Sequence, residues 1–125
     1  VIVISSRNSS DLENIGKSLS GVLQRLRPDA LVVASSDMTH HESQASANRK
    51  DKIAIDELLA LNEDSLYSKV HAMHITMCGI YPAVTMLVCA KDRGAKKAEL
   101  VRYETSGDIT GDYDHVVGYA GIIIS

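Results

Sequence analysis

The chain has 125 residues, of which 45% are hydrophobic, and this composition suits one domain with a real core rather than a disordered tail. Its 13 basic and 16 acidic residues give a net charge of −3 without a concentrated basic block, so nucleic acid is excluded as the principal partner. No apolar run approaches the roughly 20 residues that cross a bilayer, and no basic-then-apolar leader opens the sequence, so we expect a cytoplasmic protein with no membrane partner.

The first third of the chain predicts a strand, a helix and a second strand. The sequence opens on an apolar strand over Val1–Ser5, without an initiator Met or a polar leader. Ser10 and Glu13 match a capping box, and apolar residues at helical spacing then predict a packing helix that Pro28 ends. The next run, Ala30–Ser35, lacks polar alternation, as expected for a strand buried on both faces of a parallel sheet. We therefore expect a right-handed crossover unit.

The middle of the chain predicts three helices. Apolar residues from Ile53 to Leu59 favour a helix whose start the pattern does not fix, and Asn62 can cap a second, short helix. After Gly79 an almost wholly apolar run predicts a buried helix that Gly94 ends. Cys89 lies inside this run and is expected to be an inert core thiol.

The last part of the chain predicts two strands joined by a turn-rich loop. Ala98–Thr105 alternates like a strand, and Val116–Ile124 returns as a final strand. The small residues of Ser106–Asp112 between them fit either a lid or a plain connection, and we favour the connection.

Residues whose side chains can take part in catalysis or bind a metal follow the second predicted strand. A carboxylate and an imidazole lie at the carboxyl end of this strand, in the segment Ser35-Ser36-Asp37-Met38-Thr39-His40. In α/β folds, ligands bind at the carboxyl ends of strands. Further along, Thr76-Met77-Cys78-Gly79-Ile80-Tyr81-Pro82 places a thiol directly before a helix. The plain alternative for Asp37 is a helix N-cap, because side-chain oxygens satisfy the free N–H groups of a helix start.

His71 and His74 are three residues apart, a spacing that a metal can use. A third ligand is missing from this pattern, and hydrogen-bonded histidines at helix ends are common. The histidine pair therefore stays a weaker candidate than the group that contains Asp37.

Five segments together resemble one family. They occur in the order and approximate spacing of the Memo family, and the resemblance covers nearly the whole chain; the segments are Ser35–His40, Ile55-Asp56, Met77–Pro82, Tyr103-Glu104-Thr105-Ser106-Gly107-Asp108 and Val117-Gly118-Tyr119-Ala120. The sequence looks like the carboxy-terminal half of a Memo-like protein. Residues 1–125 are accordingly expected to form a single unit that is part of a longer Memo-like domain.

The resemblance implies an α/β fold in which helices cover both faces of a mixed sheet (α/β/α), related to the class III extradiol dioxygenases. It also implies a metal-capable pocket at one edge of the sheet. His40 matches the pocket histidine of the Ser-Ser-Asp-x-x-His motif, and Cys78 matches the pocket cysteine of the Cys-Gly motif. Two further family histidines come from the first half of the family's sequence, in motifs that this chain lacks. We expect a missing amino-terminal half, or a separate segment, to supply them.

The resemblance sets the expected chemistry. A site that contains His40 and Cys78 would hold copper or iron, and the thiolate favours copper(I). His40 and Cys78 would be catalytic residues as well as metal ligands, and Asp37 would be a third catalytic residue that orients or deprotonates a neighbour, unless it only caps a helix. Ser36 and Tyr81 are expected to line the pocket, although simple packing would also explain Tyr81.

Two functions remain open at this point. The first is a metal-dependent redox enzyme that acts on an unknown small molecule. The second is a non-catalytic binding or adaptor protein that uses a relict dioxygenase-type pocket to recognise a protein partner. Fold alone does not decide between them.

Overall fold

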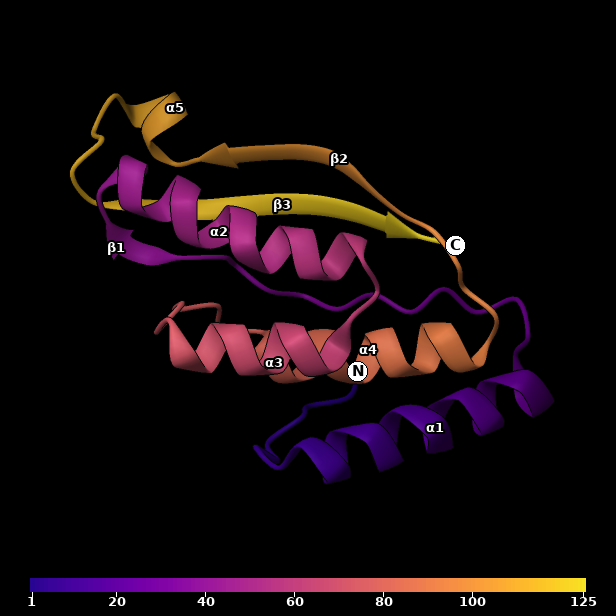
Figure 1. The fold of residues 1–125 in the computed structure, drawn as a ribbon. Helices are drawn as coiled ribbons and strands as arrows, with labels where there is room; N and C mark the ends of the chain where they lie inside the picture. The colour runs from indigo at the N-terminus through magenta and orange to yellow at the C-terminus, as the bar shows by residue number, and fades with distance from the viewer.

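The computed structural model describes residues 1–125, which form five helices and three strands. Figure 1 shows the sheet on one side of the molecule, α3 and α4 beneath it, and α1 farthest from it. In chain order the elements are α1 (Ser9–Leu26), β1 (His40–Glu42), α2 (Gln44–Leu59), α3 (Glu63–Ala72), α4 (Ile80–Asp92), β2 (Ala98–Thr105), α5 (Gly107–Thr110) and β3 (Val116–Ile124). The chain is therefore a mixed α/β protein.

The sheet has the strand order β1-β3-β2, and both neighbouring pairs are antiparallel. β2 and β3 pair from Ala98 opposite Ile124 to Thr105 opposite Gly118, with an irregularity in register after Leu100. Both strands have the bounds that the sequence pattern predicts. The connection between them contains the single short turn of α5.

The predicted strands Val1–Ser5 and Ala30–Ser35 do not form, so the expected crossover unit and parallel sheet are wrong for this structure. The segment after Ala30 runs as an extended stretch (Figure 1), but residues 31–37 make no backbone–backbone hydrogen bond. Leu31 and Val33 are 88% and 75% exposed. A strand exists only through its neighbours, and no neighbouring strand lies within hydrogen-bonding reach of this segment.

The first helix begins at a different cap from the one predicted. Asn8 is the N-cap of α1, and its side chain accepts a hydrogen bond from the backbone N–H of Ser10 at 2.9 Å. The capping box of Ser10 and Glu13 is therefore wrong, and Glu13 pairs with Lys17 instead. The extended backbone of Asn8 puts its amide oxygen over the free N–H groups of the first turn.

Three other helix ends follow the sequence more closely. Ser43 caps α2 through a contact with the N–H of Ser46, which fixes a start that the apolar pattern left open. Asn62 caps α3, as predicted. Gly94, in the left-handed region at φ 99°, follows the end of α4, as predicted.

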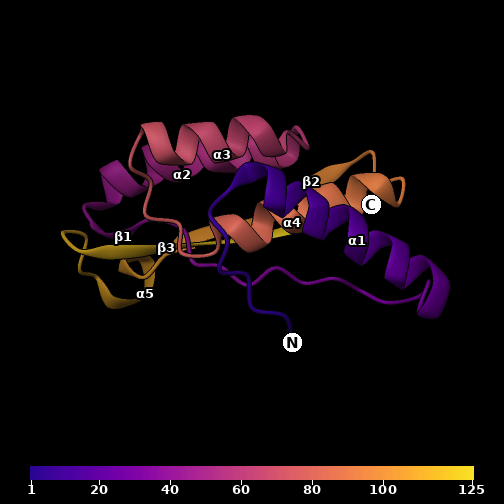
Figure 2. The same ribbon diagram turned by 90° about the horizontal axis from the view of Figure 1, so that it is seen from below.

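The core lies between α4, α2 and α3, with Leu12 of α1 packed against it. Its thirteen buried residues are Leu12, Met38, Ala54, Ile55, Leu58, Leu66, Val70, Ile75, Met77, Ile80, Ala83, Val84 and Leu87. Figure 2 shows α1 lying across α4, with α2 and α3 side by side next to them. None of these helices combines the length and the apolar character that crossing a membrane requires.

Candidate metal centre

Three chemically distinct donors converge where the predicted motifs meet. Asp37, His40 and Cys78 each offer one ligand atom, and these atoms all lie within 4.8 Å of one another. Asp37 precedes β1 and His40 begins it, whereas Cys78 comes from the turn before α4. The fold thus brings together residues that are about forty positions apart in the sequence.

Asp37 is not a helix cap, so that alternative reading is wrong. The next helix begins only at Gln44, and Ser43 is its cap. The carboxylate of Asp37 is half-exposed, and its Oδ2 lies 3.6 Å from Nε2 of His40. It is free to face a ligand or a proton donor.

Thr76 fixes the orientation of His40. Its hydroxyl accepts a hydrogen bond from the backbone N–H of His40 at 2.7 Å. Its carbonyl oxygen lies 2.7 Å from the ring Nδ1 of His40. A carbonyl can only accept, so Nδ1 carries a proton and the lone pair of Nε2 is free on the side of Asp37. Histidines that bind metals are oriented in this way.

Cys78 is exposed and lies against the backbone of Asp37. The N–H of Asp37 points at its Sγ over 3.3 Å, and the hydroxyl of Ser36 lies 4.0 Å from the same sulfur. Cys89 differs, because it is fully buried and burial raises the pKa of its thiol. The burial predicted for Cys89 is confirmed, and its low reactivity stays a prediction.

Ser36 joins the two segments that carry the donors. Its hydroxyl donates to the carbonyl oxygen of Asp37 at 2.7 Å and accepts from the backbone N–H of Gly79 at 2.8 Å. Ser36 also lines a shallow hollow of about 310 Å³, together with Arg102, Glu104, Tyr119, Ala120 and Gly121. The hollow therefore opens beside the donors.

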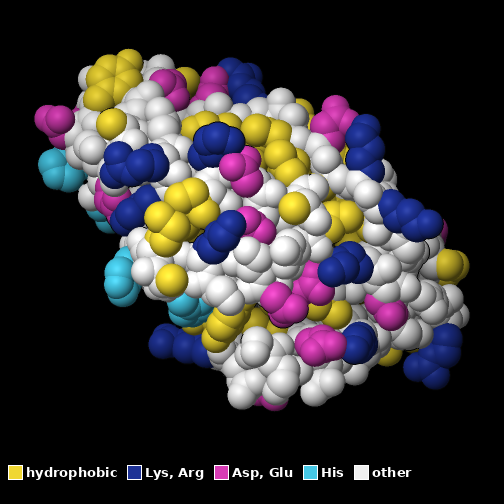
Figure 3. All heavy atoms as spheres, viewed as in Figure 1, with side chains coloured by type: hydrophobic (Ala, Val, Ile, Leu, Met, Phe, Trp, Pro, Cys, Tyr) yellow, Lys and Arg dark blue, Asp and Glu magenta, His cyan; other side chains and the backbone are white.

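Tyr81 lies in a different group of side chains. Its hydroxyl is 3.4 Å from Nε2 of His71, while Nδ1 of His71 lies 2.7 Å from the carbonyl oxygen of Tyr67. Neither His71 nor His74 belongs to a group of three potential metal ligands. Figure 3 shows histidine side chains gathered at one end of the molecule, the end where β1 and the end of α3 lie in Figure 1.

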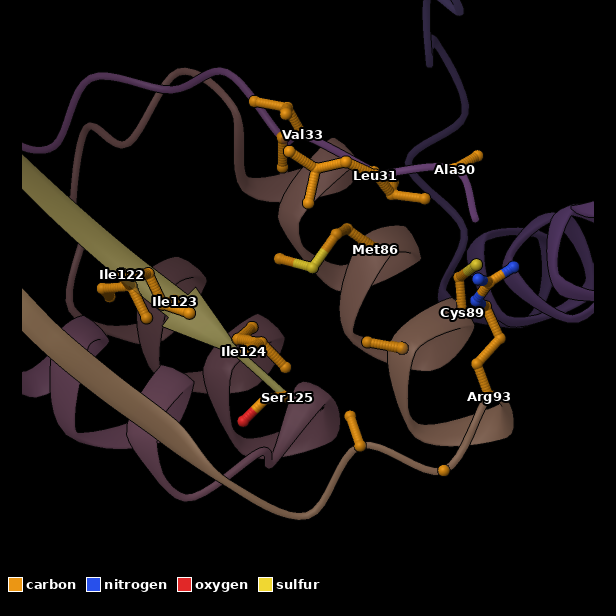
Figure 4. Close-up of a pocket in the computed structure, with 15 residues that line it drawn as sticks. Ala30, Leu31, Val33, Met86, Cys89, Arg93, Ile122, Ile123, Ile124 and Ser125 are labelled. Carbon is orange, nitrogen blue, oxygen red and sulfur yellow. The ribbon is translucent and has the colours of Figure 1, made fainter. Parts of the chain in front are cut away.

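An apolar cavity lies apart from the donors. It has a volume of about 530 Å³ and lies between the extended segment from Ala30 to Ala34, α4 and the end of β3 (Figure 4). Apolar side chains such as Leu31, Met86 and Ile124 line it. This cavity offers no cluster of polar groups for chemistry.

The donor set fits a transition-metal ion. A thiol, an imidazole nitrogen and a carboxylate oxygen are ligand types that transition metals take in proteins, and Asp37, His40 and Cys78 would be the residues that hold such an ion. Sequence reasoning found these three residues but missed Thr76, which acts through a backbone oxygen and a hydroxyl. The one available signal was its position two residues before Cys78.

The comparisons with known proteins agree on one family. A family model described as "Memo-like protein" matches residues 1–123. A MEMO1 family protein of Methanocaldococcus jannaschii is 46% identical over 110 residues, which cover 88% of this chain and 38% of that protein. A MEMO1 family protein of Aquifex aeolicus is 45% identical over 111 residues, which cover 89% of this chain and 41% of that protein. The chain thus spans about two fifths of the length of these relatives.

Proposed function

Because the chain belongs to the Memo-like protein family, we propose that Asp37, His40 and Cys78 bind a transition-metal ion and that the protein is a metal-dependent redox enzyme acting on a small molecule. The convergence of their three donor atoms within 4.8 Å carries this proposal. The contact of Nδ1 of His40 with the carbonyl oxygen of Thr76 supports it, since this contact leaves Nε2 free to bind a metal.

The carboxylate of Asp37 changes which metal ion we expect at the site. A thiolate by itself favours copper(I), whereas imidazole together with a carboxylate favours iron(II). Asp37 adds a hard oxygen to the set of His40 and Cys78, so we favour iron(II) over copper. When bound, such an ion would supply one-electron redox chemistry.

The neighbouring side chains define what a substrate would meet. The hollow beside Ser36 is lined by Arg102 and Glu104, which form an ion pair with each other, and this polar lining suits a small polar molecule. Ser36 keeps the backbone of this wall in place through Asp37 and Gly79.

We further propose that the longer family protein completes both the site and the sheet. The relatives are about two and a half times as long as the matched region, which leaves room for the additional histidines that the family resemblance implies. The extended, unpaired segment after Ala30 supports an α/β/α layered mixed sheet in the longer chain, since its exposed side chains alternate as in a strand.

Elemental analysis of anaerobically purified full-length protein, which contains this chain and the proposed additional histidines, tests the proposal. Near-stoichiometric iron or copper is expected in the wild type, with loss of most of the metal in Cys78→Ser, His40→Ala and Asp37→Asn. His115→Ala is the matched control, because His115 is exposed and lies outside the donor group. Thermal unfolding should show that every variant is folded. Absence of metal from all of the proteins would overturn the proposal and favour the adaptor function.

A further inference from the structure

We propose that Asp51 is a positioning residue that holds His40 in the tautomer needed to bind a metal, a role that rests on the proposed function. Asp51 lies in α2 and is fully buried, although helix residues on both sides of it are lysines. Because its sequence neighbours are charged, the sequence pattern around Asp51 predicts a solvated helix face. The burial of Asp51 therefore cannot be predicted from the sequence.

Through two neutral hydrogen-bond donors, Asp51 connects α2 to β2 and to the segment before β1. Its Oδ1 accepts a hydrogen bond from the backbone N–H of Thr39 at 2.9 Å, and its Oδ2 accepts one from the hydroxyl of Tyr103 in β2 at 2.8 Å. The adjacent lysines are engaged elsewhere, because Lys50 pairs with Glu42 and Lys52 pairs with Asp56. Burial, and next the contact with Asp51, raise the pKa of the Tyr103 hydroxyl, which therefore stays protonated and donates.

Gly118 of β3 makes room for this carboxylate. A Cβ atom added to Gly118 would lie 2.0 Å from Oδ2 of Asp51. The backbone of Gly118 also donates to the carbonyl oxygen of Thr39 and accepts from the N–H of Met38. The residues before His40 are thus held by β3 on one side and by Asp51 on the other.

These contacts reach His40 through one peptide unit. Thr39 is fully buried, and Asp51 provides the acceptor for its N–H group. Removal of Asp51 would leave that N–H buried without a partner, so the segment is expected to shift until the group is satisfied. His40 directly follows, and the geometry of its two contacts with Thr76 depends on this backbone.

The ring tautomer gives a test that does not require a metal. In proton–nitrogen correlation spectra of the metal-free wild type, we expect His40 to be protonated at Nδ1. In Asp51→Ala and in Gly118→Ala, which displaces the same carboxylate, we expect a mixture of the two neutral tautomers. Asp51→Asn keeps an acceptor for Thr39 and should retain the wild-type tautomer. Asp56→Ala, on the exposed face of the same helix, is the control.

Cobalt(II) titration adds the link to metal binding. We expect affinity to fall roughly 10- to 100-fold in Asp51→Ala and Gly118→Ala and to stay near the wild-type value in Asp51→Asn. A purely structural role predicts lower stability with an unchanged tautomer, so a folded Asp51→Ala or Gly118→Ala protein that keeps the Nδ1 proton overturns the inference. A folded Asp51→Asn protein in which His40 loses the Nδ1 proton also overturns the inference. If the wild type binds no cobalt, the proposed function fails, whereas the tautomer still decides the role of Asp51.

Discussion

Gly79 lies so close to Ser36 that a Cβ atom at Gly79 would be 2.4 Å from the Cβ atom of Ser36. The same atom would be 2.5 Å from the carbonyl oxygen of Ser35, which belongs to the backbone and cannot move aside alone. The segment that carries Asp37 and the turn that carries Cys78 therefore touch without an intervening side chain. The distance between the donors depends on this contact.

Gly79→Ala is expected to lower the free energy of unfolding by about 1–3 kcal/mol, because the added methyl group forces the two segments apart. Metal content should fall together with stability. Urea unfolding measures the first effect and elemental analysis the second. Gly21→Ala is the matched control, since nothing lies within 4 Å of its Cβ position and the residue is inside α1. This control should be stabilised by up to about 1 kcal/mol; equal effects of the two substitutions would contradict the steric argument.

Thr76→Val is expected to weaken cobalt(II) binding by roughly tenfold or more, since it removes the hydroxyl that accepts from the backbone N–H of His40. Valine keeps the shape of the side chain, so the effect belongs to the lost acceptor. Thr85→Val is the control, because the buried hydroxyl of Thr85 has no hydrogen-bond partner. Isothermal titration would argue against this role of Thr76 if both variants bound cobalt(II) as the wild type does.

The stabilisation that the Glu42 carboxylate contributes is expected to be lost in acid. The hydrogen bond from Lys50, followed by that from Ser46, lowers the pKa of the Glu42 carboxyl below its ordinary value. A lowered pKa in the folded state means that the stabilisation is present above the ordinary pKa, about 4.3, and is lost as the pH falls through the lowered value.

Urea unfolding at neutral pH and near pH 3 measures the contribution of Glu42. Glu42→Gln should be less stable than the wild type at neutral pH, and this difference should shrink in acid. Glu99→Gln removes an exposed pair with Lys97 and should follow the wild-type curve. A difference between Glu42→Gln and the wild type that stays constant with pH would exclude the ion pair as its cause.

The two thiols are expected to react very differently with iodoacetamide. In the folded protein Cys78 should be alkylated, because it is exposed, whereas Cys89 is fully buried and should react only after unfolding. Peptide mass spectrometry before and after addition of urea distinguishes the two sites. Bound metal should protect Cys78, and rapid labelling of Cys89 in the native protein would show that the core opens around α4.

Sequence patterns predicted correctly those helices and strands that are marked by residues close together in the sequence. The alternation over Ala98–Thr105 and Val116–Ile124 gave the bounds of β2 and β3, and Asn62 marked the start of α3. These features depend on residues that are close in the sequence. β2 and β3 also find their pairing partner in each other, so the neighbour that each strand needs is present in this chain.

The remaining features depend on distant contacts. Ala30–Ser35 reads as a buried strand, but a strand needs a hydrogen-bonded neighbour, and periodicity cannot tell whether one is present. Asp37 resembled a cap because caps and ligands use the same oxygen atoms. Thr76 and Asp51 act on a backbone far away in the sequence, so their residue types alone could not reveal their contacts.

In this structure the backbone of residues 31–37 makes no backbone–backbone hydrogen bond, so the link between α1 and the donors is open to proteases and to amide exchange with solvent. A cut after Leu31 would break the covalent connection between α1 and Asp37. Packing of α1 against α4, which carries much of the core, would still hold the two pieces together. The chain is therefore suited to survive as a nicked protein, with its donor group intact and its first helix attached only by noncovalent contacts.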